Sequence, residues 1–142
     1  MTIQRFGRLL RRLSGASAVL SGERLLIVEE EFLIALDIQR VLEDANAKAA
    51  VFAKNYNELA ALAERLHEFD LAIVNPPGPN SGEVALAERL VAVGIAVVVC
   101  SAFRGELADT VLETAEFVGK PFSDADLLAA CRRALARRRE AQ

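Results

Sequence analysis

The sequence predicts an α/β fold, in which a parallel sheet carries helices on both faces. Short, fully apolar runs recur at residues 25–28, 49–53, 71–74, 95–100 and 117–118, and such runs are typical of strands buried on both faces. Segments with apolar residues at helical spacing alternate with these runs, and the connections are short. A chain of 142 residues is long enough for one domain with a substantial core.

The helices between these strands are predicted by spacing and by capping residues. Asn46 is expected to end the first helix in the left-handed conformation, and Asn57 to cap the second. Ser123, with Asp126 three residues later, forms an approximate capping box for the last helix. Five strand–helix units favour the flavodoxin-like (βα)5 arrangement, a doubly wound parallel sheet in strand order 2-1-3-4-5. The apolar residues that mark the five helices are Ile34, Ile38, Val41, Ala45, Leu59, Leu62, Leu66, Leu86, Leu90, Val91, Leu107, Val111, Leu112, Leu127, Leu128, Cys131 and Leu135.

Charge divides the chain into a basic extension (residues 1–22), a central domain (residues 23–136) and a basic tail (residues 137–142). The first 22 residues carry four Arg and no acidic residue, whereas residues 24–131 carry 8 basic and 18 acidic residues. Basic ends can meet nucleic acid, an anionic membrane or an acidic protein surface. The tail alone is weak evidence for nucleic acid, and we expect no nucleic-acid partner.

The extension has the pattern of a basic amphipathic helix. Three interpretations are open: residues 1–22 pack on their own domain or on a second copy, they are disordered, or they contact a membrane surface. Membrane contact is the least favoured of the three. The apolar residues on one side of this helix are Ile3, Phe6, Leu9, Leu10 and Leu13, and the basic residues on the other are Arg5, Arg8, Arg11 and Arg12.

Cysteine usage indicates a reduced, cytoplasmic protein. Cys100 falls in an expected strand and Cys131 in an expected helix, so both are interpreted as small buried apolar residues instead of a disulfide pair. One His and two Cys give no plausible zinc set. No apolar run approaches the roughly 20 residues that span a bilayer.

Polar residues follow several of the expected strands, and they are expected to meet. Glu29, Glu30 and Glu31 come after the first strand, and Asn75, Ser101 and Lys120 after the third, fourth and fifth. The carboxyl ends of parallel strands form one edge of the sheet, where open α/β sheets bind their ligands. Crowded carboxylates need a divalent cation or a lysine, and Lys120 is the natural partner of Glu29 or Glu30. No glycine-rich phosphate loop follows the first strand.

Taken together, four motifs resemble the response-regulator receiver domain. They are Leu-Ile-Val-Glu-Glu-Glu-Phe at residues 26–32, Asp-Leu-Ala-Ile-Val-Asn at 70–75, Val-Cys-Ser-Ala at 99–102 and Gly-Lys-Pro-Phe at 119–122. The resemblance implies that Glu29 and Glu30 correspond to the Mg²⁺ ligands of the family. It implies that Ser101 and Lys120 contact a phosphoryl group, that Phe117 is the aromatic switch residue, and that the Lys–Pro bond is cis.

The chain departs from the family at the phosphoacceptor. The resemblance places Asn75 where the family has the Asp that a histidine kinase phosphorylates. An acyl phosphate requires a carboxylate nucleophile, and a carboxamide lacks both its charge and its nucleophilicity. Loss of one negative charge also weakens a Mg²⁺ site, so weak Mg²⁺ binding or none, and no other cofactor, is expected.

The predicted function is therefore a non-enzymatic, atypical receiver domain that acts as a protein–protein interaction module. Its partner is expected to be a signalling protein, such as a histidine kinase or another regulator, or a second copy. The resemblance implies a partner face that runs from Arg104 to Arg138. The alternative is a phosphoryl- or metal-responsive switch that uses another carboxylate, such as Glu29 or Glu30. An enzyme acting on a small substrate would need a nucleophile beside a base, which the sequence lacks.

Overall fold

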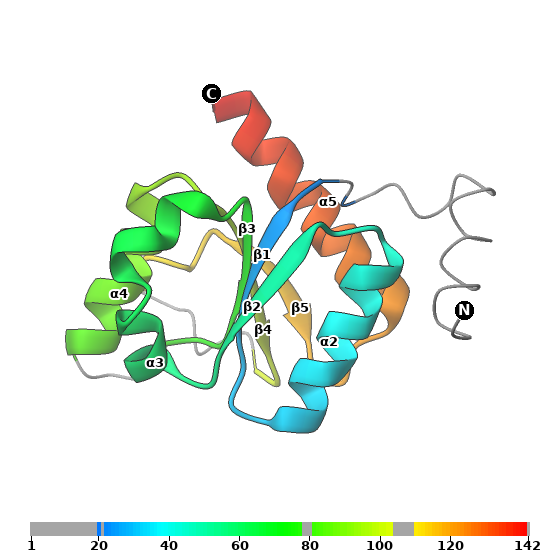
Figure 1. Cartoon of the computed structure of the whole chain (residues 1–142), viewed down its shortest axis with the longest axis horizontal. Coiled ribbons are helices and arrows are strands. Elements are labelled where there is room, and N and C mark those ends of the chain that lie inside the picture. Colours follow the sequence, from blue (N-terminus) through cyan, green and yellow to red (C-terminus); the bar gives the residue numbers. More distant parts are fainter. Residues whose placement is uncertain (1–19, 21, 78–80, 104–109, 142) are drawn as a thin grey trace.

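The computed structural model of the chain describes residues 20, 22–77, 81–103 and 110–141. Five parallel strands form one sheet in the order β2-β1-β3-β4-β5, which confirms the predicted fold class (Figure 1). The strands are β1 (Arg24–Val28), β2 (Ala49–Ala53), β3 (Leu71–Val74), β4 (Ala96–Ser101) and β5 (Glu116–Gly119).

Helices cover both faces of this sheet. Helices α2 and α5 lie on one face and α3 and α4 on the other (Figure 1). The bounds are α2 (Phe32–Asp44), α3 (Tyr56–Ala60), the 3₁₀ helix η1 (Ala63–Glu68), α4 (Ser81–Ala92) and α5 (Asp124–Ala141).

Strand β1 shows why the apolar runs become central strands. Leu25 and Ile27 lie in the core between the sheet and α2 and α5, whereas Leu26 and Val28 lie in the core beneath α3 and α4. Successive side chains of a strand point to opposite faces, so a strand with helices on both sides needs an unbroken apolar run. All four side chains are fully buried.

Two predictions about the helices need correction. Asn55, not Asn57, caps α3, because its side chain accepts a hydrogen bond from the Glu58 N–H (3.0 Å) while Glu58 accepts one from the Lys54 N–H (2.6 Å). A helix was also expected around Leu107, Val111 and Leu112. Residues 110–115 of this segment form turns and bends instead of a helix, and residues 104–109 lie outside the described residues. The caps at Asn46 (φ 73°) and Ser123 are confirmed.

The ends of the domain differ from the expected boundaries at residues 23 and 136. Leu20 is fully buried, and its N–H donates to the Ala45 carbonyl (3.0 Å), so the packed part includes Leu20. At the other end α5 continues to Ala141 without a break. The amphipathic helix expected in residues 1–22 lies mostly outside the described residues. None of the helices in the described ranges combines the length and apolar composition of a membrane span.

Candidate functional site

The candidate site lies at the carboxyl edge of the sheet, at the bottom of Figure 1, where the strands end. Glu29 follows β1, Asn75 follows β3 and Lys120 follows β5. The hydrogen-bond ladder extends one residue past each strand: the N–H of Glu29 donates to Ala53, that of Asn75 to Val28 and that of Lys120 to Ser101. These bonds fix the backbone at all three positions, so their side chains share one edge.

Glu29, Asn75 and Lys120 form a single hydrogen-bonded group, here called the Glu29–Asn75–Lys120 cluster. Lys120 Nζ lies 2.6 Å from Glu29 Oε1, which confirms the expected ion pair. The Asn75 amide bridges the pair, because its Nδ2 donates to Glu29 Oε2 (3.4 Å) and its Oδ1 accepts from Lys120 Nζ (3.3 Å). The side chain of Glu29 is 2% exposed and that of Lys120 is 20% exposed, so the pair is largely shielded from water.

A carboxamide is the side chain that suits this bridge. Its NH₂ group meets a carboxylate and its carbonyl meets an ammonium, so both polar ends have partners of the right kind. An ionised Asp could accept from Lys120 but could not donate to Glu29. One carboxylate and one ammonium balance each other, and the amide adds no charge.

The contacts of this cluster occupy the Glu29 carboxylate, which the resemblance assigned to Mg²⁺. Glu29 already accepts from Lys120 on one oxygen and from Asn75 and the Glu31 N–H (3.1 Å) on the other. Glu30 is exposed to solvent. Mg²⁺ demands close oxygen ligands in near-octahedral geometry, and the described residues contain no group of three acidic, His or Cys side chains placed to hold a metal.

The other two positions that the resemblance assigned to the switch, Ser101 and Phe117, lie outside this cluster. Ser101 is buried, and its Oγ accepts from the Phe103 N–H (3.2 Å) and donates to the Phe103 carbonyl (3.3 Å). Phe117 is half-buried on β5 and packs against the core beneath α3 and α4. Lys120–Pro121 is cis, as the resemblance implied.

Tyr56 is a site residue that the sequence analysis missed. Its hydroxyl donates to the backbone carbonyl of Asn75 (2.7 Å), and the ring is 4% exposed. It lies three residues after β2, so its position past the end of a strand was the available signal. Tyr56 also lines an open pocket of about 230 Å³ together with Glu30, Lys54, Asn75 and Glu83.

Burial, with the nearby Glu83 charge, raises the pKa of Tyr56 well above its ordinary value. The raised pKa adds stability that is fully present below the unfolded-state pKa of about 10 and is lost at higher pH. We therefore expect the absorbance of tyrosinate to appear only when the protein unfolds at alkaline pH. Circular dichroism recorded in the same titration measures the unfolding. The chain has one Tyr and no Trp, so the titration reports on this residue alone. Tyrosinate formed near pH 10 in the folded protein would contradict the buried hydrogen bond.

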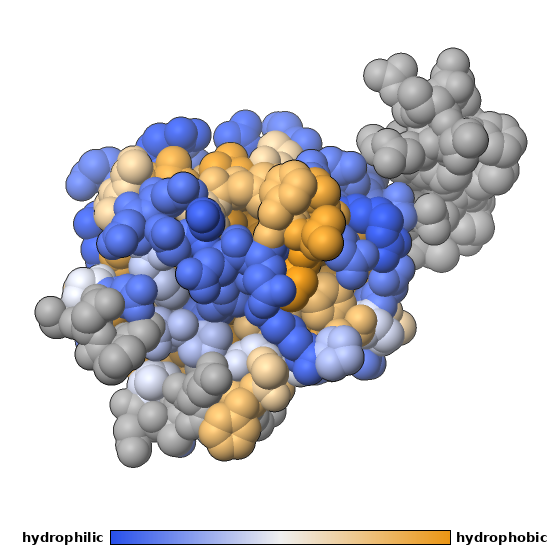
Figure 2. All heavy atoms as spheres, turned by 90° about the horizontal axis from the view of Figure 1, so that it is seen from below, coloured by the Kyte–Doolittle hydropathy of each residue, from blue (hydrophilic) through white to orange (hydrophobic). Residues whose placement is uncertain are grey.

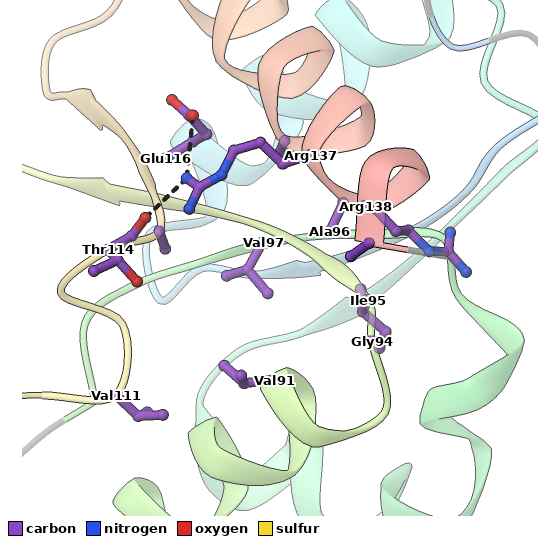
Figure 3. Close-up of a pocket in the computed structure, with 13 residues that line it drawn as sticks. Val91, Gly94, Ile95, Ala96, Val97, Val111, Thr114, Glu116, Arg137 and Arg138 are labelled. Carbon is purple, nitrogen blue, oxygen red and sulfur yellow. Dashed lines mark hydrogen bonds and ion pairs between the residues drawn. The ribbon is translucent and has the colours of Figure 1, made fainter.

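A groove between α4, β4 and α5, here called the α4–α5 groove, borders the expected partner face from Arg104 to Arg138. It is lined in part by residues 111–138 of that face and in part by residues 91–97, which lie outside it. Val91, Val97 and Val111 line the groove, and its volume is about 390 Å³ (Figure 3). Val91 and Val111 are exposed, and Arg137 closes one side by donating to the Thr114 carbonyl (2.8 Å) and to Glu116 (3.3 Å). Part of the expected face, residues 104–109, lies outside the described residues.

The basic tail is bound to the domain. Arg138 pairs with Asp70 (3.1 Å) and Arg139 with Glu23 (3.5 Å). Arg133 and Arg137 both pair with Glu116. Burial alone would raise the pKa of Glu116, but these two arginines outweigh it and hold that pKa below its usual range. The guanidinium groups of α5 therefore complement the acidic domain.

The chain is similar in sequence to a regulatory protein. The chain is 32% identical to the transcriptional regulatory protein PdtaR of Mycobacterium tuberculosis over 121 residues, which cover 82% of this chain and 58% of that protein. It thus spans little more than half the length of the curated relatives it matches. No family model matches the chain.

Solved structures extend the comparison. The response regulator PhyR from Brucella abortus is 30% identical, with a TM-score of 0.65 over 97% of this chain and 58% of that one. A CheY-like response regulator receiver domain protein from Methanospirillum hungatei is 20% identical, with a TM-score of 0.70 over 86% of this chain and 100% of that one. The second likeness shows the fold alone, whereas the first adds sequence similarity.

Proposed function

We propose that the chain is a receiver domain of the response-regulator family that signals through protein contact without phosphotransfer. Its sequence similarity to PdtaR and PhyR supports the family. One observation carries the proposal. Where the family has its phosphoacceptor, this chain has Asn75, and the amide of Asn75 is hydrogen-bonded to both Glu29 and Lys120.

The chemistry of the cluster supports this proposal. An acyl phosphate forms when a carboxylate oxygen attacks phosphorus and displaces the leaving group of the donor. The amide nitrogen of Asn75 is a poor nucleophile, and its hydrogen bond to Glu29 further occupies it. Lys120, which would contact the phosphoryl oxygen in the family, is paired with Glu29 at 2.6 Å. The site is therefore a charge-balanced structural cluster, and we propose that it binds Mg²⁺ weakly or not at all.

Phosphodonor treatment tests this function directly. After incubation of the full chain with acetyl phosphate and Mg²⁺, intact-mass spectrometry is expected to show no phosphorylated species. The Asn75→Asp variant under the same conditions is the positive control. Acid-labile phosphate on the unmodified chain, mapped to Glu29 or Glu30, would instead establish the alternative switch on another carboxylate.

The α4–α5 groove is the surface that we propose for the partner. Its apolar floor and exposed Val91 and Val111 suit an apolar side chain of another protein. The relatives are named regulators, which supports a signalling protein, or a second copy, as the partner in the cytoplasm. The pairing of the α5 arginines within the domain gives no support for a nucleic-acid surface.

A self-association test separates these two partners. If a second copy occupies the groove, sedimentation of the full chain shows a dimer that the double substitution Val91→Glu and Val111→Glu weakens at least tenfold. The double substitution Ala60→Glu and Ala61→Glu adds the same two charges at exposed positions at the end of α3, which do not line the groove. It is the matched control and leaves the dimer intact. A dimer that survives the double substitution would place the contact elsewhere.

A further inference from the structure

The outward face of α2 begins with exposed apolar side chains. Phe32 is 72% exposed, Leu33 is 79% exposed and Leu36 is 43% exposed. They lie on the side of the helix opposite Ile38 and Leu42, which are buried in the core. Figure 2, which views the molecule from the carboxyl ends of the strands, shows apolar side chains gathered beside strongly hydrophilic ones on this face.

Acidic residues surround these apolar side chains. Residues 30–44 contain five acidic residues and one basic residue. The basic residue, Arg40, pairs with Asp37 (2.7 Å), Asp44 (4.0 Å) and Asp124 (3.0 Å). Glu30 and Glu31, directly before the helix, are exposed. A ligand for this surface therefore needs apolar side chains together with positive charge.

The first 13 residues of this same chain have that composition. Their pattern combines five large apolar residues with four arginines and no acidic residue. An amphipathic basic segment complements an apolar surface bordered by carboxylates, since apolar contact gives affinity and opposite charge gives orientation.

The chain connection brings this segment to α2. Leu20 is buried and bonded to Ala45, immediately after the C-terminal end of α2. Residues 14–19 can span up to about 20 Å, and the 13 residues of α2 extend roughly 20 Å. Residues 1–13 can therefore reach any point of α2 in the same molecule. A short tether gives an effective concentration on the order of millimolar, well above that of a second copy in dilute solution.

We propose that residues 1–13 bind in cis to the outer face of α2, defined by Glu30, Glu31, Phe32, Leu33 and Leu36. The bound segment covers the surface next to the Glu29–Asn75–Lys120 cluster, so any protein that uses this face has to displace it. The inference goes beyond the proposed function, because it concerns a different surface from the α4–α5 groove.

Paramagnetic relaxation in the full chain tests the proposal. A nitroxide is attached at Gln4→Cys, while Cys100 and Cys131 are buried and shielded from the label. The amide signals of Phe32, Leu33 and Leu36 are expected to lose more than half of the intensity that they have when the nitroxide is reduced. The substitutions Leu33→Glu and Leu36→Glu, both at exposed positions, are expected to restore it. Val93→Glu, at an apolar position that is 44% exposed and so matches Leu36, is the control and leaves the broadening unchanged.

A mixed sample distinguishes the occupants. Nitroxide-labelled chains of natural isotope abundance are mixed with isotope-enriched chains that carry no nitroxide. Only the enriched chains give signals, so any broadening reports a contact between two molecules. Broadening of α2 in this mixture, in proportion to the fraction of nitroxide-labelled chains, would assign the face to a second copy and overturn the cis proposal. Absence of broadening at α2 in the sample of singly labelled chains would also overturn the proposal. The same holds if the α2 signals broaden only after anionic vesicles are added.

Discussion

Replacing Asn75 by Asp is expected to make the thermal stability of the domain depend on Mg²⁺. Without metal the variant loses the hydrogen bond to Glu29 and places two carboxylates side by side, which we expect to cost about 1–3 kcal/mol. Adding Mg²⁺ should reverse this loss, because the new carboxylate completes an acidic site with Glu29 and Glu30. Metal at 100 times its Kd would stabilise the folded state by about 2.7 kcal/mol.

Thermal unfolding with EDTA and with Mg²⁺ measures this dependence. At roughly 4 °C per kcal/mol for a domain of this size, the Tm of Asn75→Asp should rise by about 10 °C with metal, whereas the Tm of the unmodified chain should not change. Asn57→Asp, at an exposed position in the first turn of α3, adds the same charge away from the cluster and is the control. A metal-dependent Tm in the unmodified chain would show that Asn75 does not prevent Mg²⁺ binding.

Replacing Lys120 by Met is expected to destabilise the fold strongly. The substitution removes the ion-pair partner of Glu29 while the Glu29 side chain stays 2% exposed. Leaving one charge of a buried pair without its partner typically costs about 3–5 kcal/mol. Because Lys120 is itself 20% exposed, we expect the lower end, about 3 kcal/mol.

Urea unfolding of the unmodified chain, of Glu29→Gln, of Lys120→Met and of the double variant isolates the pair. The double variant Glu29→Gln with Lys120→Met should recover at least half of the loss, since no unpaired charge remains, and the double-mutant cycle gives the coupling energy. Lys48→Met removes an exposed lysine and should change stability by less than about 0.5 kcal/mol. A loss below 1 kcal/mol in Lys120→Met would mean that the ion pair does not stabilise this edge.

The strand pattern was the most predictable part of the fold. The central strands are buried on both faces, so their apolar runs and their order could be inferred from sequence. The convergence of Glu29, Asn75 and Lys120 followed, because parallel strands end at one edge. The orientation of the Asn75 amide could not be inferred, since it depends on distances of a few tenths of an ångström between three loops.

Other features depend on contacts that no local pattern encodes. Asn55 and Asn57 are equally good caps by residue type, and the reciprocal bond with Glu58 decides between them. Tyr56 has no motif, and only the packing of α3 brings its hydroxyl to the Asn75 carbonyl. The arginines of α5 resembled a free tail because Glu23, Asp70 and Glu116, their partners, are far away in sequence.

The central proposal is that Asn75 removes phosphoryl control from this domain. Amide NMR spectra of the full chain, recorded with Mg²⁺ and then with beryllofluoride, which mimics an acyl phosphate, test it most directly. We expect no change in the signals of Glu29, Glu30, Asn75, Ser101 and Lys120 at millimolar Mg²⁺, and none after beryllofluoride is added. Shifts at these residues that spread to Phe117 would show a working phosphoryl switch and would contradict the account.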